Sequence, residues 1–431
     1  MSELYDIFRR HPRISTDTRR IEPGSVFFAL HGATFDGNRF AADALSKGAA
    51  YAVVDDPAAV SGDRTVLVGD TLEALQELAR EYRRELAIPI LAISGSNGKT
   101  TTKELVSRVL AERFEVYATH GNLNNHIGVP LTLLAMTRDT EFGVVEMGAS
   151  ACGEIALLAS IAEPNYGILT NIGRAHLEGF GGPEGIRRGK GELLDYLAAN
   201  GGRAFVPRED QTLTNMAAER DGLAAEYYSV TLADGIAHHL EGDYNRFNIA
   251  AAVAVGRYFD IDGERIRHAV GSGFRAADRG DPIRHAVGSY MPDNNRSQRT
   301  ETERNTLIVD CYNANPSSMR ASVLNFLAEP AGGRSRRVLI LGDMLELGAW
   351  SEQEHRDIVA LAARNPDAEL MLVGGEFARA CAGMEPQPAN TALFPSREEL
   401  IAELRRRPVE NAFVLVKGSR GIGLEKALEE L

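Results

Sequence analysis

Residues 90–102 read ILAISGSNGKTTT, and the architecture of the chain follows from this stretch. An apolar, β-branched run leads into a glycine-containing loop, and a helix-compatible segment continues from Lys99 to Arg113. A strand, a tight loop and a helix start form the setting in which a Gly-Lys-Thr triplet binds phosphate. The stretch therefore predicts an α/β sheet with a nucleotide site at this loop.

The residues of the loop suit that chemistry. Gly95 and Gly98 let backbone N–H groups approach phosphate oxygens, and the helix N-terminus adds partial positive charge. Lys99 supplies a point charge to the β/γ-phosphates, and the Thr100 hydroxyl is a candidate Mg²⁺ ligand. Ile93 stands where the longer pattern has glycine, so the loop is a shortened variant, GxxGKT. The alternative is a plain Gly/Ser/Asn turn between a buried strand and a helix.

The composition is that of an ordinary soluble globular protein, with 44% apolar and 25% charged residues. Its 431 residues suggest about three domains. A net charge of −13 argues against a nucleic-acid or anionic-membrane partner. The three cysteines have no metal spacing, the first twenty residues lack an apolar signal segment, and no apolar run reaches membrane-spanning length. We therefore expect a cytoplasmic protein without membrane insertion.

The first 86 residues predict a small α/β domain. Apolar runs and helical spacing predict strands at 25–30 and 50–54 and helices at 39–47 and 71–86. The segment STDTRR at residues 15–20 combines hydroxyls, a carboxylate and arginines. Such a cluster can hydrogen-bond a nucleobase or pair with a diphosphate, and it can equally be a solvated cap or turn.

Residues 87–275 alternate strand and helix, as in a doubly wound, mostly parallel sheet. Glu146 and His176 each fall at the carboxyl end of a predicted strand, where ligands of such sheets gather, and Lys190 lies on the helix that follows His176. The alternatives are that Glu146 is a solvent-exposed residue at a strand end and that His176 and Lys190 are structural or solvated. Because these strand ends would lie beside the same phosphate loop, we favour a functional role for these residues. The expected strands and helices lie at 115–119, 142–147, 166–170, 183–197, 204–206, 224–230 and 243–258.

A charged, turn-rich stretch over 271–305 predicts the second boundary, and residues 276–431 predict a third, Rossmann-like α/β domain. Its expected strands lie at 306–311, 337–341, 370–373 and 412–416. Polar turns follow three of these strands, so we expect them to meet at one edge of the sheet. The chain has no GxGxxG fingerprint, and NAD is therefore not expected.

A series of motifs runs through the chain between residues 95 and 421: GSNGKTTTKE, GNLNNHIGVPLTLL, EMGAS, TNIGRAHLEGFG with GKGEL, YNRFN, DCYNANPSSM, LGDMLELG and VKGSRG. The order of these motifs resembles that of the Mur ligase family. DTRRIEPGSVFFALHGATFDG is similar to the family's N-terminal UDP-binding segment, with Asn38 where a histidine is expected. DCYNANPSSM together with LGDMLELG resembles the branch of the family that adds D-alanyl-D-alanine.

The resemblance implies an ATP-dependent ligase of peptidoglycan precursor synthesis. ATP phosphorylates a carboxylate of UDP-N-acetylmuramoyl-tripeptide, and the amine of D-alanyl-D-alanine then attacks the acyl phosphate. It implies that residues 1–86 bind the UDP substrate, residues 87–275 bind ATP, and residues 276–431 bind the ATP ribose and the incoming dipeptide. Mg²⁺ and a carbamylated Lys190 are implied as cofactors, and we expect a monomer without a nucleic-acid partner.

The resemblance also implies a role for each matching residue. Lys99 binds the transferring γ-phosphate, Thr100 and Glu146 hold one Mg²⁺, His176 holds a second, and carbamylation turns Lys190 into a carboxylate-like ligand. The other implied ATP-binding residues are Gly95, Ser96, Asn97, Gly98, Thr101, Asn248 near adenine, Arg296, and Asp310 at the ribose. The implied substrate-binding residues are Asp17, Thr18, Arg19, Asn122, Asn125, Tyr312, Asn313, Asn315 and Lys417.

Three alternatives remain open from the sequence. The first is a sister amide ligase, such as the tripeptide-forming Mur enzyme or folylpolyglutamate synthase. The second is a P-loop ATP-binding module without ligation, and the third is a purely structural α/β protein. The sequence does not say whether the tripeptide carries lysine or diaminopimelate.

Overall fold

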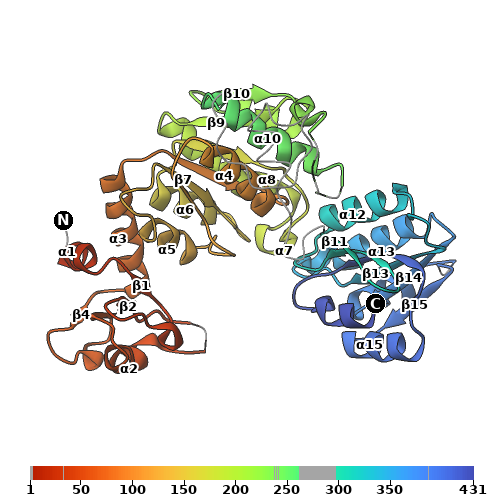
Figure 1. Cartoon of the computed structure of the whole chain (residues 1–431), viewed down its shortest axis with the longest axis horizontal. Helices are drawn as coiled ribbons and strands as arrows, with labels where there is room; N and C mark the ends of the chain where they lie inside the picture. Colours follow the sequence, from red (N-terminus) through yellow and green to blue (C-terminus); the bar gives the residue numbers. More distant parts are fainter. Residues whose placement is uncertain are drawn as a thin grey trace.

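The computed structural model describes residues 3–32, 34–236, 238, 240, 242–261, 298–386 and 388–431. These residues form three α/β units in chain order, each built on its own sheet, which we call the first, middle and third units. In Figure 1 the units form an arch with the middle unit at its top. No helix in the described ranges is both long enough and apolar enough to cross a membrane. The predicted three-domain α/β fold class is confirmed.

The first unit is a four-stranded parallel sheet in the order β1-β2-β3-β4. Strand β2 is the apolar VFF run and is buried along its whole length. The predicted helix at 39–47 begins as a 3-10 turn, Gly37–Phe40. Strands β1 and β4 were not predicted, because two or three residues that are not buried are too few to form an alternating pattern. The elements are α1 (Glu3–Arg10), β1 (Ile14–Ser15), β2 (Val26–Phe28), α2 (Ala41–Ser46), β3 (Tyr51–Val54), β4 (Thr65–Leu67) and α3 (Thr71–Leu86).

The middle unit is a six-stranded parallel sheet in the order β10-β9-β8-β5-β7-β6. Its central strand β5 is buried throughout, with β7 on one side and β8 on the other. The strand order reverses beside β5, which creates the crevice where such sheets bind ligands. The elements are β5 (Ile90–Ser94), α4 (Lys99–Ala111), β6 (Val116–Ala118), α5 (Gly128–Leu134), β7 (Phe142–Glu146), α6 (Glu154–Ala162), β8 (Tyr166–Leu169), α7 (Leu177–Phe180), α8 (Pro183–Ala199), β9 (Arg203–Pro207), α9 (Gln211–Ala218), β10 (Ala224–Tyr228) and α10 (Asn245–Tyr258).

The third unit is a six-stranded sheet in the order β11-β12-β16-β13-β14-β15, with only β11 antiparallel to its neighbour. Strand β11 lies within the stretch predicted as a turn-rich boundary, and that part of the prediction is wrong. Its sequence, QRTE, lacks the apolar residues that mark a strand because it lies at the edge of the sheet. The elements are β11 (Gln298–Glu301), β12 (Thr306–Asp310), α12 (Pro316–Ala328), β13 (Arg336–Gly342), α13 (Ser351–Ala362), β14 (Ala368–Val373), α14 (Gly375–Ala382), β15 (Thr391–Phe394), α15 (Arg397–Arg406) and β16 (Ala412–Lys417).

Helix α3 connects the first and middle units and packs against both. Leu75 belongs to the same buried cluster as Phe8 of α1. On the middle-unit side, the buried Arg83 donates to the backbone carbonyl of Ala162 at the end of α6, at 2.9 Å. Gln76 donates to a carbonyl in the loop before α5. The first unit is therefore attached through a shared helix rather than a flexible linker.

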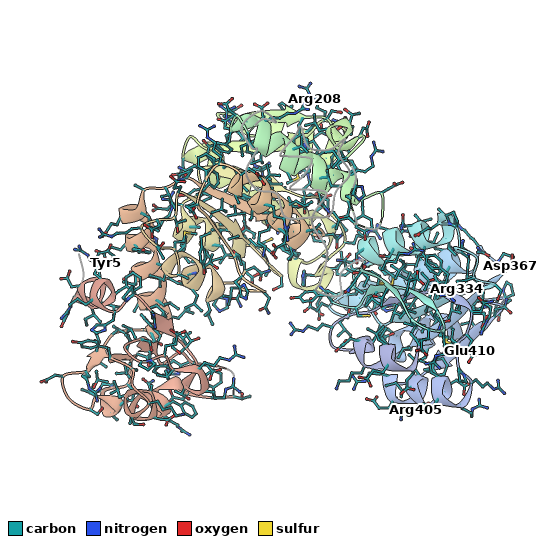
Figure 2. All side chains as sticks on the ribbon, in the orientation of Figure 1. Tyr5, Arg208, Arg334, Asp367, Arg405 and Glu410 are labelled. Carbon is teal, nitrogen blue, oxygen red and sulfur yellow. The ribbon has the colours of Figure 1, made fainter. Side chains whose placement is uncertain are left out.

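Charged side chains are distributed in two ways. Arg208, Asp367 and Arg405 lie at the outer edges of the middle and third units, where water solvates their charges (Figure 2). Other charged side chains are buried, which is uncommon unless a neighbouring polar or oppositely charged group pairs with the charge. Three of the buried ones are residues predicted for the functional site, namely Glu146, Lys190 and Lys417.

Candidate active site

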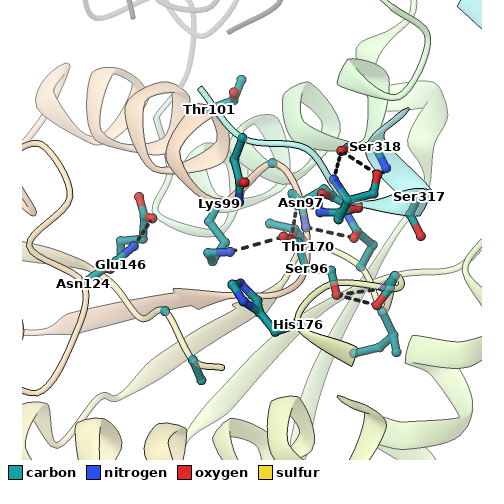
Figure 3. A pocket seen from close by; sticks show the side chains of 18 of the residues that line it. Ser96, Asn97, Lys99, Thr101, Asn124, Glu146, Thr170, His176, Ser317 and Ser318 are labelled. Carbon is teal, nitrogen blue, oxygen red and sulfur yellow. Dashed lines mark hydrogen bonds between the residues drawn. The ribbon is translucent and has the colours of Figure 1, made fainter. Parts of the chain in front are cut away.

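A cavity of about 840 Å³ lies between the middle and third units. Its walls include the loops after β5, β6, β7 and β8 and the start of α10 in the middle unit, and the loops after β12 and β13 and the end of β16 in the third. Figure 3 shows the side chains of Lys99 and His176 near each other, with Glu146 and Asn124 to the left of them. The predicted residues that line the cavity are Ser96, Asn97, Gly98, Lys99, Thr101, Asn122, Asn125, Glu146, His176, Asn248, Asp310, Tyr312, Asn313, Asn315 and Lys417.

The phosphate loop requires its glycines. Gly95 has φ +130° and Gly98 has φ +80°, conformations that other residues rarely adopt. A Cβ at position 95 would lie 2.1 Å from Oγ1 of Thr170, and one at position 98 would lie 2.7 Å from Oδ1 of Asn248. No side chain caps the N-terminus of α4, so its N–H groups are available to phosphate. The Lys99 ammonium donates to the carbonyl of Gly95 at 2.9 Å and thus folds back over the loop.

Glu146 is held by one hydrogen bond on each carboxylate oxygen. Thr100 Oγ1 donates to Oε2 at 2.9 Å, and Asn124 Nδ2 donates to Oε1 at 2.8 Å. A carboxylate beside a hydroxyl offers the hard oxygen donors that Mg²⁺ prefers, so this pair fits the predicted ion. Within the described ranges, no three His, Cys, Asp or Glu side chains cluster closely enough to hold a metal by themselves. Mg²⁺ in nucleotide sites commonly takes its remaining ligands from phosphates and water.

Burial lowers the pKa of both His176 and Lys190. Burial lowers the pKa of His176, the charges of Lys190 and Lys99 lower it further, and Glu346 opposes the shift. A neutral imidazole is the form that binds metal ions. Lys190 is 1% exposed and donates to the carbonyl of Ala149 at 2.9 Å. Burial, followed by the charge of Lys99, lowers the pKa of Lys190 well below its ordinary value.

An ion pair forms the third-unit wall of the cavity. Asp310 and Lys417 are partners in the register of β12 and β16, and their side chains contact each other. Asp310 also accepts a hydrogen bond from Ser322 at 3.1 Å. Tyr312 and Asn313 continue the same wall. The three polar turns predicted to meet at one sheet edge do so, because β12, β16 and β13 are neighbours.

Contacts between side chains join the middle and third units beside the cavity. Asn315, which caps α12, donates to Oδ1 of the phosphate-loop residue Asn97 at 2.7 Å. The backbone N–H of Arg174 donates to Ser317 Oγ at 2.8 Å, and the Arg174 guanidinium pairs with Glu354, whose side chain is 5% exposed. The phosphate loop therefore contacts the third unit directly.

Asn248 supports the phosphate loop. Its side chain is buried, accepts from Thr102 Oγ1 at 3.1 Å and donates to Asn245 Oδ1 at 2.8 Å. Tyr244 and Phe247 line the cavity beside it. The predicted contact of Asn248 with adenine stays a prediction.

The other predicted site residues lie elsewhere. Asp17, Thr18 and Arg19 do not line the cavity; the Arg19 guanidinium and backbone N–H both donate to Asp17, and these bonds lower the pKa of Asp17 to about 2. Asn38 is buried and donates to Asp55 Oδ1 at 2.7 Å, so it holds together a turn of the first unit. Arg296 lies outside the described residues.

Asn124 and Glu346 are among the cavity residues that the sequence patterns did not single out, and both contact predicted site residues. The loop GNLNN contains three asparagines, and its pattern does not reveal which amide turns inward. Asn125 instead accepts from the backbone N–H of Gly128 at 2.9 Å, at the start of α5. A carboxylate four residues after the end of β13 was the available signal for Glu346.

Three regions of the chain match domains of the Mur ligase family. Residues 12–83 match the Mur ligase family catalytic domain. Residues 93–237 match the Mur ligase middle domain, and residues 295–420 match the Mur ligase glutamate ligase domain. The first two regions fall in the first and middle units, and the last covers most of the third.

Relatives of known name align over nearly the whole chain. The UDP-N-acetylmuramoyl-tripeptide–D-alanyl-D-alanine ligases of Bacillus subtilis and Escherichia coli are each 33% identical over 97% of this chain, and the alignments cover 92% and 93% of those proteins. A crystal structure of MurF from Acinetobacter baumannii superposes with a TM-score of 0.82 at 29% identity, covering 97% of this chain and 93% of that one. MurF from Thermotoga maritima in complex with ADP gives 0.80 at 25% identity, covering 100% and 98%. The chain therefore belongs to the Mur ligase family and, within it, to the UDP-N-acetylmuramoyl-tripeptide–D-alanyl-D-alanine ligases.

Proposed function

We propose that this chain uses ATP to join D-alanyl-D-alanine to UDP-N-acetylmuramoyl-tripeptide, a step of peptidoglycan precursor synthesis. The observation that carries the proposal is the cavity of about 840 Å³ between the middle and third units. The phosphate loop, Glu146 and His176 form its middle-unit wall, and the opposite wall includes Tyr312 and Lys417. Such a cavity can bring an activated acid and an amine together. Relatives named for this reaction align over nearly the full length.

The first step transfers the γ-phosphoryl group of ATP to a substrate carboxylate and releases ADP. Phosphate and carboxylate repel each other, so positive charge is needed where they meet. Lys99 and the N-terminus of α4 supply part of it. Bound Mg²⁺ supplies further positive charge and orients phosphate oxygens. Thr100 and Glu146 would hold one ion, and His176 would hold another.

We place a carbamate on Lys190. The neutral amine attacks the carbon of CO₂, an N–C bond forms as one C=O π bond opens onto oxygen, and the amine proton passes to water, which converts the side chain into an oxygen ligand. The burial of Lys190 and its lowered pKa favour the neutral amine that this step requires. Ala149, whose carbonyl accepts the hydrogen bond from Lys190, lines the cavity, so the amine lies next to it.

In the second step the dipeptide amine attacks the acyl phosphate, and the tetrahedral intermediate collapses to an amide and phosphate. An acyl phosphate must be protected from water, which favours closure of the units around it. We assign UDP binding to residues 1–86 through Asp17, Thr18 and Arg19, and ATP binding to residues 87–275. Residues 276–431 bind the ribose at Asp310 and the dipeptide through the wall that includes Tyr312, Asn313, Asn315 and Lys417.

Phosphate release with different amines tests the proposal. The purified chain is incubated with ATP, Mg²⁺, UDP-N-acetylmuramoyl-tripeptide and one amine donor at a time. We expect release with D-alanyl-D-alanine and none with single amino acids; release only with a free amino acid would refute the assignment. Chelation by EDTA should stop the reaction. We also propose that the enzyme acts as a cytoplasmic monomer, which size-exclusion chromatography and cell fractionation test.

A further inference from the structure

We propose that Glu346 is a positioning residue that orients the imidazole of His176, so that the third unit completes the metal-binding arrangement of the middle unit. The inference rests on the metal role of His176 in the proposed function. Glu346 is not one of the predicted metal-binding or substrate-binding residues. Its contact with His176 connects metal binding to the position of the third unit.

The contact joins two unusual backbone positions. The Glu346 carboxylate contacts Nδ1 of His176 across the boundary between the units. Glu346 has φ +62° and His176 has φ +54°, both in the left-handed region that non-glycine residues seldom occupy. Such strain persists where surrounding structure imposes it, and it concentrates at functional sites. Both side chains line the cavity.

The loop that carries Glu346 is anchored on the third-unit side. The backbone N–H of Met344 donates to Nε2 of the fully buried His355 at 2.9 Å. The next N–H, of Leu345, donates to Ser419 Oγ at 3.0 Å. Two successive backbone groups before Glu346 are thus fixed, and the carboxylate is presented from a rigid support.

The same loop is also tied to the middle unit. The Glu346 backbone carbonyl accepts from the N–H of Glu178 at 3.3 Å, in helix α7 directly after His176. Trp350 lies against Gly182, between α7 and α8, where a Cβ would be 3.1 Å from its ring. Glu346 therefore reaches His176 only when the third unit is docked on α7.

The chemistry of metal-binding histidines explains what this contact does. Such a histidine commonly donates its second ring N–H to a carboxylate, which fixes the tautomer and the ring orientation. With Nδ1–H donated to Glu346, the lone pair of Nε2 on His176 is left for a metal ion. Because the carboxylate comes from the other unit, docking and metal affinity are linked, and each must strengthen the other.

Mn²⁺ binding tests the inference directly. Electron paramagnetic resonance measures the Mn²⁺ affinity of the full chain with a non-hydrolysable ATP analogue. We expect Glu346→Ala to weaken Mn²⁺ binding about 10-fold or more, and Glu346→Gln to weaken it less because the amide oxygen still accepts a hydrogen bond. Glu352→Ala is the matched control, since Glu352 is an exposed third-unit carboxylate paired with Arg356, and it should leave the affinity unchanged.

A double-mutant cycle separates positioning from other roles. His176→Ala alone should weaken Mn²⁺ binding, and adding Glu346→Ala to it should cause no further loss. An affinity within twofold of wild type in Glu346→Ala, or an undiminished loss in the His176→Ala background, would overturn the inference. A raised KM for D-alanyl-D-alanine with unchanged Mn²⁺ affinity would also overturn it and assign Glu346 to the dipeptide ammonium.

The same cycle distinguishes failure of the inference from failure of the proposed function. If His176→Ala leaves Mn²⁺ affinity unchanged, the metal role of His176 is refuted, and the positioning role of Glu346 falls with it. If only the Glu346 variants are without effect, the metal role stands and positioning alone is refuted. Thermal melting of each variant verifies that the fold is intact.

Discussion

Replacing Asn124 with alanine tests the arrangement around Glu146. The substitution removes the 2.8 Å hydrogen bond to Oε1 and leaves the one from Thr100 to Oε2. A hydrogen bond to a charged group contributes about 1.5–3 kcal/mol. Glu146 is 2% exposed but lines an open cavity, so water replaces part of the bond and we expect a loss of about 1.5–2 kcal/mol. For a unit of this size, that loss lowers the melting temperature by about 3–8 °C.

Differential scanning calorimetry of Asn124→Ala and Asn122→Ala measures the effect. Asn122 is the matched control because it is an exposed asparagine two positions away in the same loop. Asn124→Asp should be more destabilising than alanine, since it places a second negative charge against Glu146. Phosphate release should fall in both Asn124 variants, because the carboxylate loses its fixed orientation. Equal melting temperatures for Asn124→Ala and Asn122→Ala would refute the reasoning.

Lys190→Ala should abolish phosphate release, and an added short-chain carboxylic acid should restore part of it in the same assay. Arg174→Met removes the cation beside Glu354, whose side chain is 5% exposed, and should reduce the free energy of unfolding by about 2–3 kcal/mol in chemical denaturation. This is below the usual cost for a buried pair because the Arg174 side chain is itself 55% exposed. Burial lowers the pKa of His355 in the folded chain below its ordinary value of 6.5. As the pH falls below 6.5, His355 therefore binds a proton more readily in the unfolded chain than in the folded chain. Stability should therefore fall as the pH drops from 7.5 to 5.5, and calorimetry of His355→Gln should show a smaller fall.

Each of these expectations has a contrary outcome. Full turnover in Lys190→Ala would favour a P-loop module without ligation. Unchanged unfolding of Arg174→Met, or no recovery on adding Glu354→Gln, would mean that the ion pair does not stabilise the boundary between the units. An equal pH dependence in His355→Gln and wild type would assign the acid sensitivity to other groups.

The middle unit was the most predictable part of the chain. The run ILAIS is apolar enough to be buried, and the Gly-Lys-Thr triplet that follows allows few arrangements other than a loop before a helix. Glu146 and His176 were predictable because strand ends of a parallel sheet share one edge. Their placement in one cavity with Lys99 agrees with that reasoning.

Other features depend on contacts that a sequence pattern does not encode. Asn124 and Asn125 are adjacent and chemically identical, and only the fold turns one amide toward Glu146 and the other toward the start of α5. The polar edge strand β11 pairs through its backbone, so its side chains carry no periodic signal. The contact of Glu346 with His176 joins residues 170 positions apart, which no local pattern predicts.

Helix α3 has a practical consequence for anyone who dissects this protein. A fragment that starts at residue 87 would lack α3, which packs against α5 and α6. The carbonyl of Ala162 would then lose its hydrogen-bond donor, Arg83. A fragment that stops before Thr71 would remove the helix that α1 packs against, including Tyr82 beside Phe8. The same helix thus supplies contacts to both units, and neither unit keeps its packing without it. Truncations should therefore retain residues 71–86 on both halves.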